Sequence, residues 1–485
     1  MSKNSHTFYV FTFFILSNLI HAQEVLLEFN TDYDAGPALI DNSFTLVNEA
    51  TDDFTVFLTN NSNLSAFNYS NSYEFKGWLA SRKLPNKYKV PLGGTVNKQK
   101  YSLFYANENN SKFAVVTFDF EKNWSFASEI DLDLKKEVYL SQFIYKNKFH
   151  LLTSSYRESV LYMYSFTNSG EYVKESIDID HYEFYGPEQY PTRLKSTLGL
   201  DIQNNELTKI TAVQEGIPYS LDSMVSLIKL YIIEDSFYLV SDINSDFTQI
   251  IAHDLRNGTT KADFINHASL ERALTNSYLT GNKLFQIAVN SKNMSVRITD
   301  LLTKEIYKQH DIAKTDSLYL ANGPIRQRGG RYTAYRELEK TAQFLRKLGN
   351  GKPAIYVNEN SNQFEITIGS VDEISNDLIT AIAYLNPVSA VASFGALTLY
   401  ANPVALAMIK ASNSKAVYIN NILDSNFEPI NQEEKENIFF VINDYIEKED
   451  LKRITASDVF KYKNFYVFGV LDKKTKTYTL RKFVP

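Results

Sequence analysis

The sequence contains no cysteine among its 485 residues, which excludes disulfides, thiolate nucleophiles and cysteine-ligated zinc. The same absence argues against a lipid-modified N-terminal cysteine, so we do not expect a lipoprotein. Histidine is also scarce, with seven in the chain, and no two are spaced as a metal-binding pair. We therefore predict no metal site and no cofactor. His150 follows Phe149 in a strand-like run, and we interpret it as a packed side chain rather than a ligand.

Neither sign of charge dominates the chain. Its formal net charge is -6, which argues against broad electrostatic attraction to nucleic acid, and we predict no nucleic-acid partner. Hydrophobic residues make up 44% and charged residues 22%, as in ordinary soluble globular proteins.

Long apolar runs are absent outside the N-terminus and one internal segment. Residues 7–20 are mostly apolar, Lys3 precedes them, and Ile20-His21-Ala22 offers a cleavage site with Ala22 last, so residues 1–22 resemble a signal peptide. The run has about 14 residues and a membrane span needs about 20, so we expect cleavage rather than anchoring. The mature chain, residues 23–485, is predicted to be periplasmic or extracellular, without a transmembrane span.

Aromatic residues are abundant instead, with 32 Tyr and 33 Phe. Seven triplets have the pattern aromatic-x-aliphatic, which we call the aromatic signature. Its aromatic and aliphatic members are Phe54 and Val56, Tyr101 and Leu103, Phe149 and Leu151, Phe237 and Leu239, Phe285 and Ile287, Phe364 and Ile366, and Phe465 and Val467.

The spacing of the aromatic signature indicates the architecture. Where nothing intervenes, signatures are about 47 or 48 residues apart, the length of a four-stranded propeller blade. The chain thus resembles β-propeller proteins over residues 23–485, at the level of architecture and not of a specific family. After the last signature the chain contains one strand fewer than a four-stranded blade needs, and residues 24–29 are predicted to supply that strand. We therefore predict an all-β, seven-bladed β-propeller closed by pairing of residues 24–29 with residues 477–484.

Three irregular gaps indicate insertions, at about 182–225, 313–352 and 370–413. The second is predicted to contain a helix over about 333–348, with apolar residues at helical spacing. The second insertion is rich in basic residues. The third insertion is a long apolar loop that repeats a Tyr-x-Asn-Pro-Val motif. All three insertions are expected on one face of the disc. The residues chosen as a candidate binding site are Arg326, Arg328, Arg331, Arg336, Tyr384 and Tyr400.

Acidic residues offer two further interpretations, and the structural one is favoured for each. Asp178 and Asp180 resemble a carboxylate pair, but acids in such runs fit outer blade strands, where charge prevents edge-to-edge pairing. Residues 242–246 begin like a calcium loop, but Phe247 replaces the required glycine, so a polar hairpin turn is expected.

Two classes of function remain open. The leading hypothesis is a non-catalytic binding or assembly module whose insertions contact a protein partner or the cell envelope. The alternative is a carbohydrate-active or other hydrolytic enzyme with its site in the central funnel. The apolar loop is equally open to a structural interpretation, in which it packs on the propeller and plugs the channel. We predict no catalytic residue.

Overall fold

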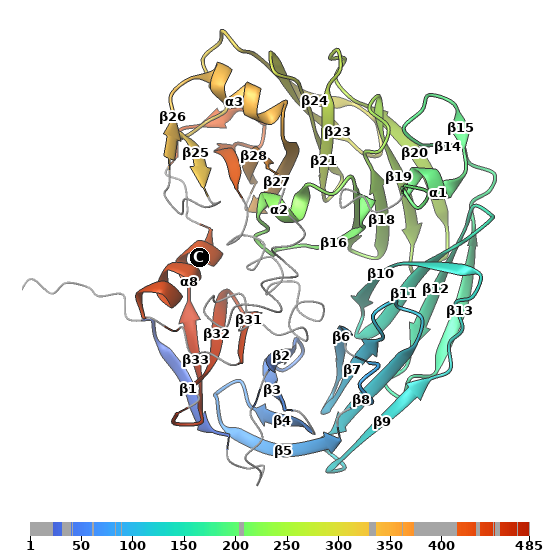
Figure 1. The fold of residues 1–485 in the computed structure, drawn as a ribbon, viewed down its shortest axis with the longest axis vertical. Helices are drawn as coiled ribbons and strands as arrows, with labels where there is room; N and C mark the ends of the chain where they lie inside the picture. The colour runs from blue at the N-terminus through green and yellow to red at the C-terminus, as the bar shows by residue number, and fades with distance from the viewer. Residues whose placement is uncertain are drawn as a thin grey trace, which may run out of the picture.

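The computed structural model describes residues 23–31, 40, 42–60, 63–82, 84–88, 90–202, 208–328, 336–360, 362–372, 415–432, 437–449, 451, 456–472 and 474–484. Within these residues the chain forms seven sheets of four or more strands. Figure 1 shows them following one another around a common centre, in a propeller-like all-β arrangement. The predicted signal peptide, residues 1–22, lies outside the described residues.

We number the sheets in chain order. The first holds β2 (Asn42–Asn48), β3 (Asp53–Thr59), β4 (Asn63–Tyr69) and β5 (Phe75–Arg82). The second holds β6 (Val90–Asn97), β7 (Lys100–Ala106), β8 (Phe113–Asp119) and β9 (Trp124–Ile130). The third holds β10 (Glu137–Tyr145), β11 (Lys148–Ser155), β12 (Val160–Phe166) and β13 (Tyr172–Asp178).

The fourth sheet is β16 (Thr211–Gln214), β17 (Ile228–Ile233), β18 (Ser236–Ser241), β19 (Phe247–Asp254) and β20 (Thr260–Asn266). The fifth is β21 (Leu274–Thr280), β22 (Lys283–Val289), β23 (Asn293–Asp300) and β24 (Ile306–Ala313). The sixth is β25 (Ile325–Arg328), β26 (Arg336–Leu338), β27 (Lys352–Asn360), β28 (Gln363–Val371), β29 (Ala416–Leu423) and β30 (Pro429–Ile430). The seventh is β1 (Val25–Asn30), β31 (Ser457–Tyr462), β32 (Phe465–Asp472) and β33 (Thr477–Phe483).

The two ends of the described chain meet in the seventh sheet. β1 pairs with β33 in antiparallel register, with Phe29 opposite Tyr478 and Asn30 opposite Thr477. The sequence predicted these two partners. Beyond its own sheet, the Phe29 ring lies 5.1 Å from that of Phe67 and 5.3 Å from that of Tyr69 (centroid distances). Because both rings belong to β4, the N-terminal strand also contacts the first sheet.

Each aromatic signature lies on the strand expected for it, and its side chains fill the space between sheets. The seven strands are β3, β7, β11, β18, β22, β28 and β32, and every signature residue is buried. In strands, alternate side chains point to opposite faces, so the aromatic and aliphatic members face the same neighbouring sheet. Phe149 of the third sheet, for example, stacks on Phe104 of the second with ring centroids 4.3 Å apart.

The neighbour contacted differs between sheets. In the first four sheets the signature faces the preceding sheet, counted around the ring. In the fifth, Gln286 reaches back to the fourth sheet, and Phe285 therefore faces forward, 5.6 Å from Phe364 of the sixth. In the seventh, Phe465 and Val467 pack into the cluster shared with the first sheet. The triplet thus identifies the strand but not the face it presents.

The helices of the described residues lie in the insertions and linkers: α1 (Leu194–Thr197), α2 (Leu221–Met224), α3 (Thr341–Leu348) and α8 (Ile438–Lys448). The helix predicted over 333–348 was therefore wrong over residues 336–340. Arg336 to Leu338 form β26, which pairs with β25 and so satisfies its backbone groups in the sheet. α3 begins only at Thr341, and buries Phe344, Leu345 and Leu348.

Two details of the acidic runs also differ from expectation. β13 ends at Asp178, so Asp180 lies beyond the outer strand. The chain leaves the outer strand of the second sheet in the same way, since β9 ends at Ile130 and the acidic residues Asp131 and Asp133 follow it. The reason is that Leu132 and Leu134 turn inward and are buried between sheets, which takes the chain out of the strand. The hairpin turn predicted at residues 242–246 does connect β18 to β19.

We predict that Phe29→Ala will lower the free energy of unfolding by about 2 kcal/mol, because it empties a half-buried site between the first and seventh sheets. Chemical denaturation of the mature chain measures the change. Val25→Ala on the same strand is the matched control, since Val25 is 44% exposed and its loss is expected to cost under about 0.5 kcal/mol. Equal effects of the two substitutions would contradict the structural role of Phe29.

Candidate functional site

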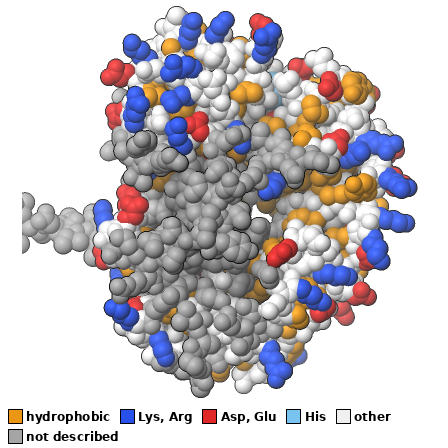
Figure 2. All heavy atoms as spheres, in the orientation of Figure 1, with side chains coloured by type: hydrophobic (Ala, Val, Ile, Leu, Met, Phe, Trp, Pro, Cys, Tyr) orange, Lys and Arg blue, Asp and Glu red, His pale blue; other side chains and the backbone are white. Residues whose placement is uncertain are grey.

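The structure brings three of the predicted arginines into one hairpin at the outer edge of the sixth sheet. Arg326 and Arg328 lie on β25 and Arg336 on β26, and Gln327 is opposite Arg336 in the register. We call β25 and β26 the basic hairpin. The space-filling view shows lysine and arginine side chains gathered over the part of the molecule formed by β25, β26 and α3 (Figure 2). Arg336 is exposed and Arg326 and Arg328 are half-buried.

The basic hairpin is held in place on both sides. β25 pairs with β29 on its inner side, with Arg326 opposite Tyr418. The guanidinium carbon of Arg328 lies 3.8 Å from the ring centroid of Phe440 in α8, a cation–π contact. The arginines are thus presented by a fixed strand. Arg331, Tyr384 and Tyr400, together with most of the apolar loop, lie outside the described residues.

The middle of the ring holds part of the first insertion. β16 and α2 lie inside the ring of sheets (Figure 1), and we call residues 211–224, which run from one to the other, the central segment. At Gly216 the backbone has φ of +72°, a conformation that favours glycine. The Gly216 carbonyl accepts hydrogen bonds from Lys461 Nζ at 3.0 Å and from the Tyr466 hydroxyl at 3.3 Å, both from the seventh sheet.

Tyrosines pack around the central segment. The Tyr356 hydroxyl of the sixth sheet donates to the Ile217 carbonyl at 3.0 Å, and the Tyr356 ring contacts those of Tyr219 and Tyr278 at 6.3 and 5.4 Å. Burial raises the pKa of Tyr219 to about 12 and that of Tyr278 further above its ordinary value. These hydroxyls therefore stay protonated. The Tyr219 hydroxyl accepts a hydrogen bond from Gln214 N at 2.9 Å, within the central segment.

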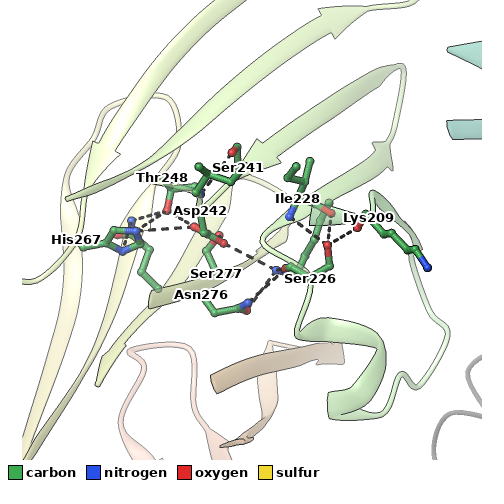
Figure 3. A network of polar contacts seen from close by, with 12 residues as sticks. Lys209, Ser226, Ile228, Ser241, Asp242, Thr248, His267, Asn276 and Ser277 are labelled. Atoms are coloured by element: carbon green, nitrogen blue, oxygen red, sulfur yellow. Dashed lines mark hydrogen bonds and ion pairs between the residues drawn. The ribbon is translucent and has the colours of Figure 1, made fainter. Parts of the chain in front are cut away.

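A second group of polar side chains is buried between the fourth and fifth sheets, and Figure 3 shows it in close-up. Lys229 of β17 is fully buried, and its Nζ donates to the Ser226 carbonyl at 2.7 Å and to Asn276 Oδ1 at 3.2 Å. It lies 3.8 Å from Asp242 Oδ2. The Asp242 carboxylate also accepts hydrogen bonds from Thr248 at 2.7 Å and from Ser277 at 2.8 Å. Asn276 and Ser277 belong to β21, so this network joins two sheets.

Burial sets the protonation of the network. Loss of hydration lowers the pKa of Lys229 to about 8, with Asp242 opposing the shift. His267 Nε2 lies 3.8 Å from Asp242 Oδ1, and burial lowers the pKa of His267 as well, again against the attraction of Asp242. At neutral pH, Lys229 and Asp242 form a buried ion pair beside a neutral histidine. Since the Lys229 and Asp242 side chains are fully buried, the pair is placed to hold sheets together rather than to contact a ligand.

The first insertion is hydrogen-bonded to β18, β19 and the turn between them, next to this network. Ser241 Oγ donates to the Thr197 carbonyl of α1 at 2.6 Å, and Asn244 Nδ2 donates to the Gly186 carbonyl at 3.0 Å. Gln249 Nε2 donates to the Glu183 carbonyl at 2.7 Å. The short hairpin of β14 (Phe184–Tyr185) and β15 (Pro191–Thr192) and the following α1 thus rest on the turn between β18 and β19.

This network is not apparent from the sequence. Its one visible signal is Lys229, a lysine inside the otherwise apolar run of β17. Its partner Asp242 was assigned to an ordinary turn, because nothing in the local pattern shows that the turn is covered. His150 is packed as predicted: it is buried and stacks on Phe143 with ring centroids 4.9 Å apart.

The described residues lack two further features. They contain no group of three or more His, Cys, Asp or Glu side chains arranged to hold a metal ion. No helix in this part of the chain is long and apolar enough to cross a membrane.

Comparison with known proteins indicates no specific family. No family model matches the chain, and no curated protein does. A mutant of Synechocystis apocarotenoid oxygenase aligns with a TM-score of 0.29 and 6% identity, over 57% of this chain and 63% of that one. A Lactobacillus plantarum protein aligns with a TM-score of 0.28 and 10% identity, over 69% and 81%. The chain thus covers less than two thirds of the oxygenase, and similarity this low carries no functional argument.

Lys229→Met is predicted to lower the free energy of unfolding by about 3 kcal/mol, because it leaves the Asp242 carboxylate buried without its cation. Asp242→Asn is expected to be destabilising for the converse reason. The double variant should lose clearly less stability than the sum of the two single losses. Denaturant unfolding of the unmodified protein, the two single variants and the double variant measures this. Lys261→Met, at an exposed position of the fourth sheet, is the control. Additive effects would show that the pair is not coupled.

Acid should destabilise the protein partly through His150. Burial lowers the pKa of His150 to about 4 from an ordinary 6.5. Between these values only the unfolded chain binds the proton, so stability is retained above pH 6.5 and lost as the pH falls toward 4, by up to about 3 kcal/mol. We expect His150→Gln to reduce the stability difference between pH 7 and pH 4.5, measured by urea unfolding. His181→Gln, at an exposed histidine, should leave that difference unchanged. An undiminished difference in His150→Gln would refute the assignment.

Proposed function

We propose that the protein is an exported, seven-bladed β-propeller that acts as a non-catalytic binding or assembly module. The order of the seven described sheets around one centre and the pairing of β1 with β33 support a closed ring. Residues 1–22 support export with cleavage after Ala22, and an intact mass beginning at Gln23 would verify it. We propose a protein partner or the envelope surface as the target.

The basic hairpin is the observation that carries the proposal. The protein has a net charge of -6, yet three arginines gather at one outer edge, beside a sheet that fixes their positions. A fixed positive patch on an acidic protein favours association with an acidic partner, since complementary charge steers encounter and selects the partner.

The central segment favours this function over the hydrolytic alternative. It occupies part of the middle of the ring with Ile217, Tyr219, Leu221 and Met224, all buried. A hydrolytic site in a central funnel requires open space lined by at least two carboxylates. The central segment takes up part of that space, and its buried residues include Ser220, Ser223 and one carboxylate, Asp222. Function is therefore better sought at the outer insertions.

We expect the mature chain to capture a partner from the envelope or medium of its source, and to lose that partner when Arg326, Arg328 and Arg336 are all changed to glutamate. Charge reversal should lower capture at least about tenfold, because the favourable potential becomes repulsive. Affinity capture with quantitative mass spectrometry measures it.

The matched control reverses three exposed lysines on other sheets and turns, Lys122, Lys136 and Lys261. It changes net charge equally and should retain the partner. The single variant Arg336→Glu, at an exposed position, separates loss of binding from loss of folding. Capture that survives the triple arginine reversal, or that the lysine control abolishes equally, would refute the basic hairpin as the contact site.

A further inference from the structure

The sequence contains three asparagines that are each followed by glycine: Asn257, Asn322 and Asn350. Such a pair can lose ammonia without an enzyme, because glycine has no side chain to block the approach of its backbone nitrogen to the asparagine side chain. The glycine nitrogen gives up its proton and bonds to the asparagine Cγ, the bond from Cγ to Nδ2 breaks, and the amide nitrogen leaves as ammonia. Water then opens the resulting succinimide ring at either carbonyl, which leaves aspartate or isoaspartate.

The reaction requires freedom of two groups in the folded protein. The side-chain amide must rotate over the next backbone nitrogen, and that nitrogen must be able to release its proton. Hydrogen bonds that hold either group slow the reaction, because they must open before the two atoms can meet. Since the three pairs consist of the same two residues, the structure can distinguish them by how firmly it holds each one.

Asn322 is held by the sixth sheet. Its Nδ2 donates to the Ile430 carbonyl at 2.8 Å and to the Gln432 carbonyl at 3.0 Å. Its backbone nitrogen donates to the Asn420 carbonyl of β29 at 3.0 Å. Rotation of this amide would break both of its hydrogen bonds, so the structure protects Asn322.

Asn257 is exposed, yet both of its reacting groups are engaged in the turn between β19 and β20. Its Oδ1 accepts a hydrogen bond from Thr259 N at 2.9 Å, and its Nδ2 donates to Asp254 Oδ2 at 3.2 Å. The backbone nitrogen of Gly258 donates to the Asp254 carbonyl at 2.9 Å. Asp254 thus holds the amide and the attacking nitrogen apart from each other.

Asn350 differs from both. It lies in the turn between α3 and β27 and is exposed, and its side-chain amide makes no hydrogen bond to another described residue. The backbone nitrogen of Gly351 donates to the Leu348 carbonyl at 3.3 Å, longer than the ordinary range for such a bond. Neither reacting group is therefore firmly held.

We propose that Asn350 is a site of spontaneous deamidation in the folded protein, whereas Asn257 and Asn322 are protected. This goes beyond the proposed function, because it concerns a modification of the chain and not a partner. The modification places a negative charge just after the C-terminus of α3, where the helix dipole disfavours it.

The isoaspartyl product also lengthens the backbone in a turn with little room. A Cβ on Gly349 would lie 2.6 Å from Ser291 N, and a Cβ on Gly351 would lie 2.9 Å from Ser370 Oγ. Because both flanking glycines are packed this closely, the added backbone atom is expected to displace α3 from its neighbours and to destabilise the protein.

The test is to age the mature chain in mildly alkaline buffer and to follow each of the three sites by peptide mapping with mass spectrometry. We expect Asn350 to deamidate at least about tenfold faster than Asn257 or Asn322, since each protected amide must first open two hydrogen bonds. In urea, where the chain is unfolded, the three rates should converge to within about threefold.

Two variants test the cause. Asp254→Ala removes one hydrogen bond of the Asn257 amide and should speed deamidation there by at least about threefold, with the rate at Asn350 unchanged. Asn350→Gln should stop the modification at residue 350, because glutamine would have to close a larger ring. Ageing should lower the Tm of the unmodified sequence by at least about 1 °C and leave that of Asn350→Gln unchanged.

Equal rates at the three sites of the folded protein, or a faster rate at Asn257 or Asn322, would overturn the inference. A ranking that persists in urea would do the same, because it would assign the difference to neighbouring residues and not to the fold. An unchanged rate at Asn257 in folded Asp254→Ala would refute the protection assigned to its hydrogen bonds. If that variant does not fold by circular dichroism, the comparison of folded and unfolded chain decides. Equal losses of Tm in the unmodified sequence and Asn350→Gln would refute the effect on α3.

Discussion

The whole structure depends on aromatic side chains packed between neighbouring sheets. A single four-stranded sheet has two apolar faces and cannot bury either alone, so each sheet needs a neighbour on both sides. The stacked rings of Phe104 and Phe149 and the Phe285–Phe364 contact are instances of one solution repeated around the centre. Phe29 meets the same requirement where the chain ends meet, because it brings the N-terminal strand against the first sheet.

This packing explains which parts of the fold the sequence could predict. A period of 47 or 48 residues marks the strands correctly, because an aromatic and an aliphatic residue two positions apart must share one face. The spacing does not show which neighbouring sheet this face contacts, because that depends on what the opposite face of the same sheet packs against. In the fifth sheet, Gln286 donates a hydrogen bond to Thr248 of the fourth sheet. The neighbouring residue Phe285 therefore points to the opposite face, toward the sixth sheet. The false helical start has a similar cause, since Arg336 to Leu338 gain sheet pairing that a local helical pattern cannot reveal.

The candidate functional residues were likewise predicted from the sequence only in part. The arginines were found from charge clustering alone, and Arg326, Arg328 and Arg336 do share one hairpin. Lys229 and Asp242 were missed, because their relation depends on a turn becoming covered by an insertion that begins some sixty residues earlier in the chain. A buried ion pair is costly unless its hydrogen bonds are satisfied. Here Asn276 and Ser277 supply them from the next sheet, so the pair fixes how two sheets dock.

The location of function follows from how the insertions are used. The first insertion is drawn inward: its central segment is held by hydroxyls and an ammonium from the sixth and seventh sheets, and its other half is fastened above the Lys229 network. The polar atoms that reach the fourth, sixth and seventh sheets are engaged within the molecule, whereas Ser220 Oγ, Asp222 Oδ1 and Ser223 Oγ are buried without a hydrogen bond to a described residue. The second insertion instead turns outward, adds an outer hairpin to the sixth sheet and leaves Arg336, Lys314 and Lys340 exposed, together with the carboxylates of Asp316 and Glu339, the apolar side chain of Pro324 and the half-buried Leu318. Groups already satisfied internally gain little from a partner, whereas exposed charges beside apolar surface gain from both attraction and burial. The outward insertion is therefore the better placed of the two to recognise another molecule.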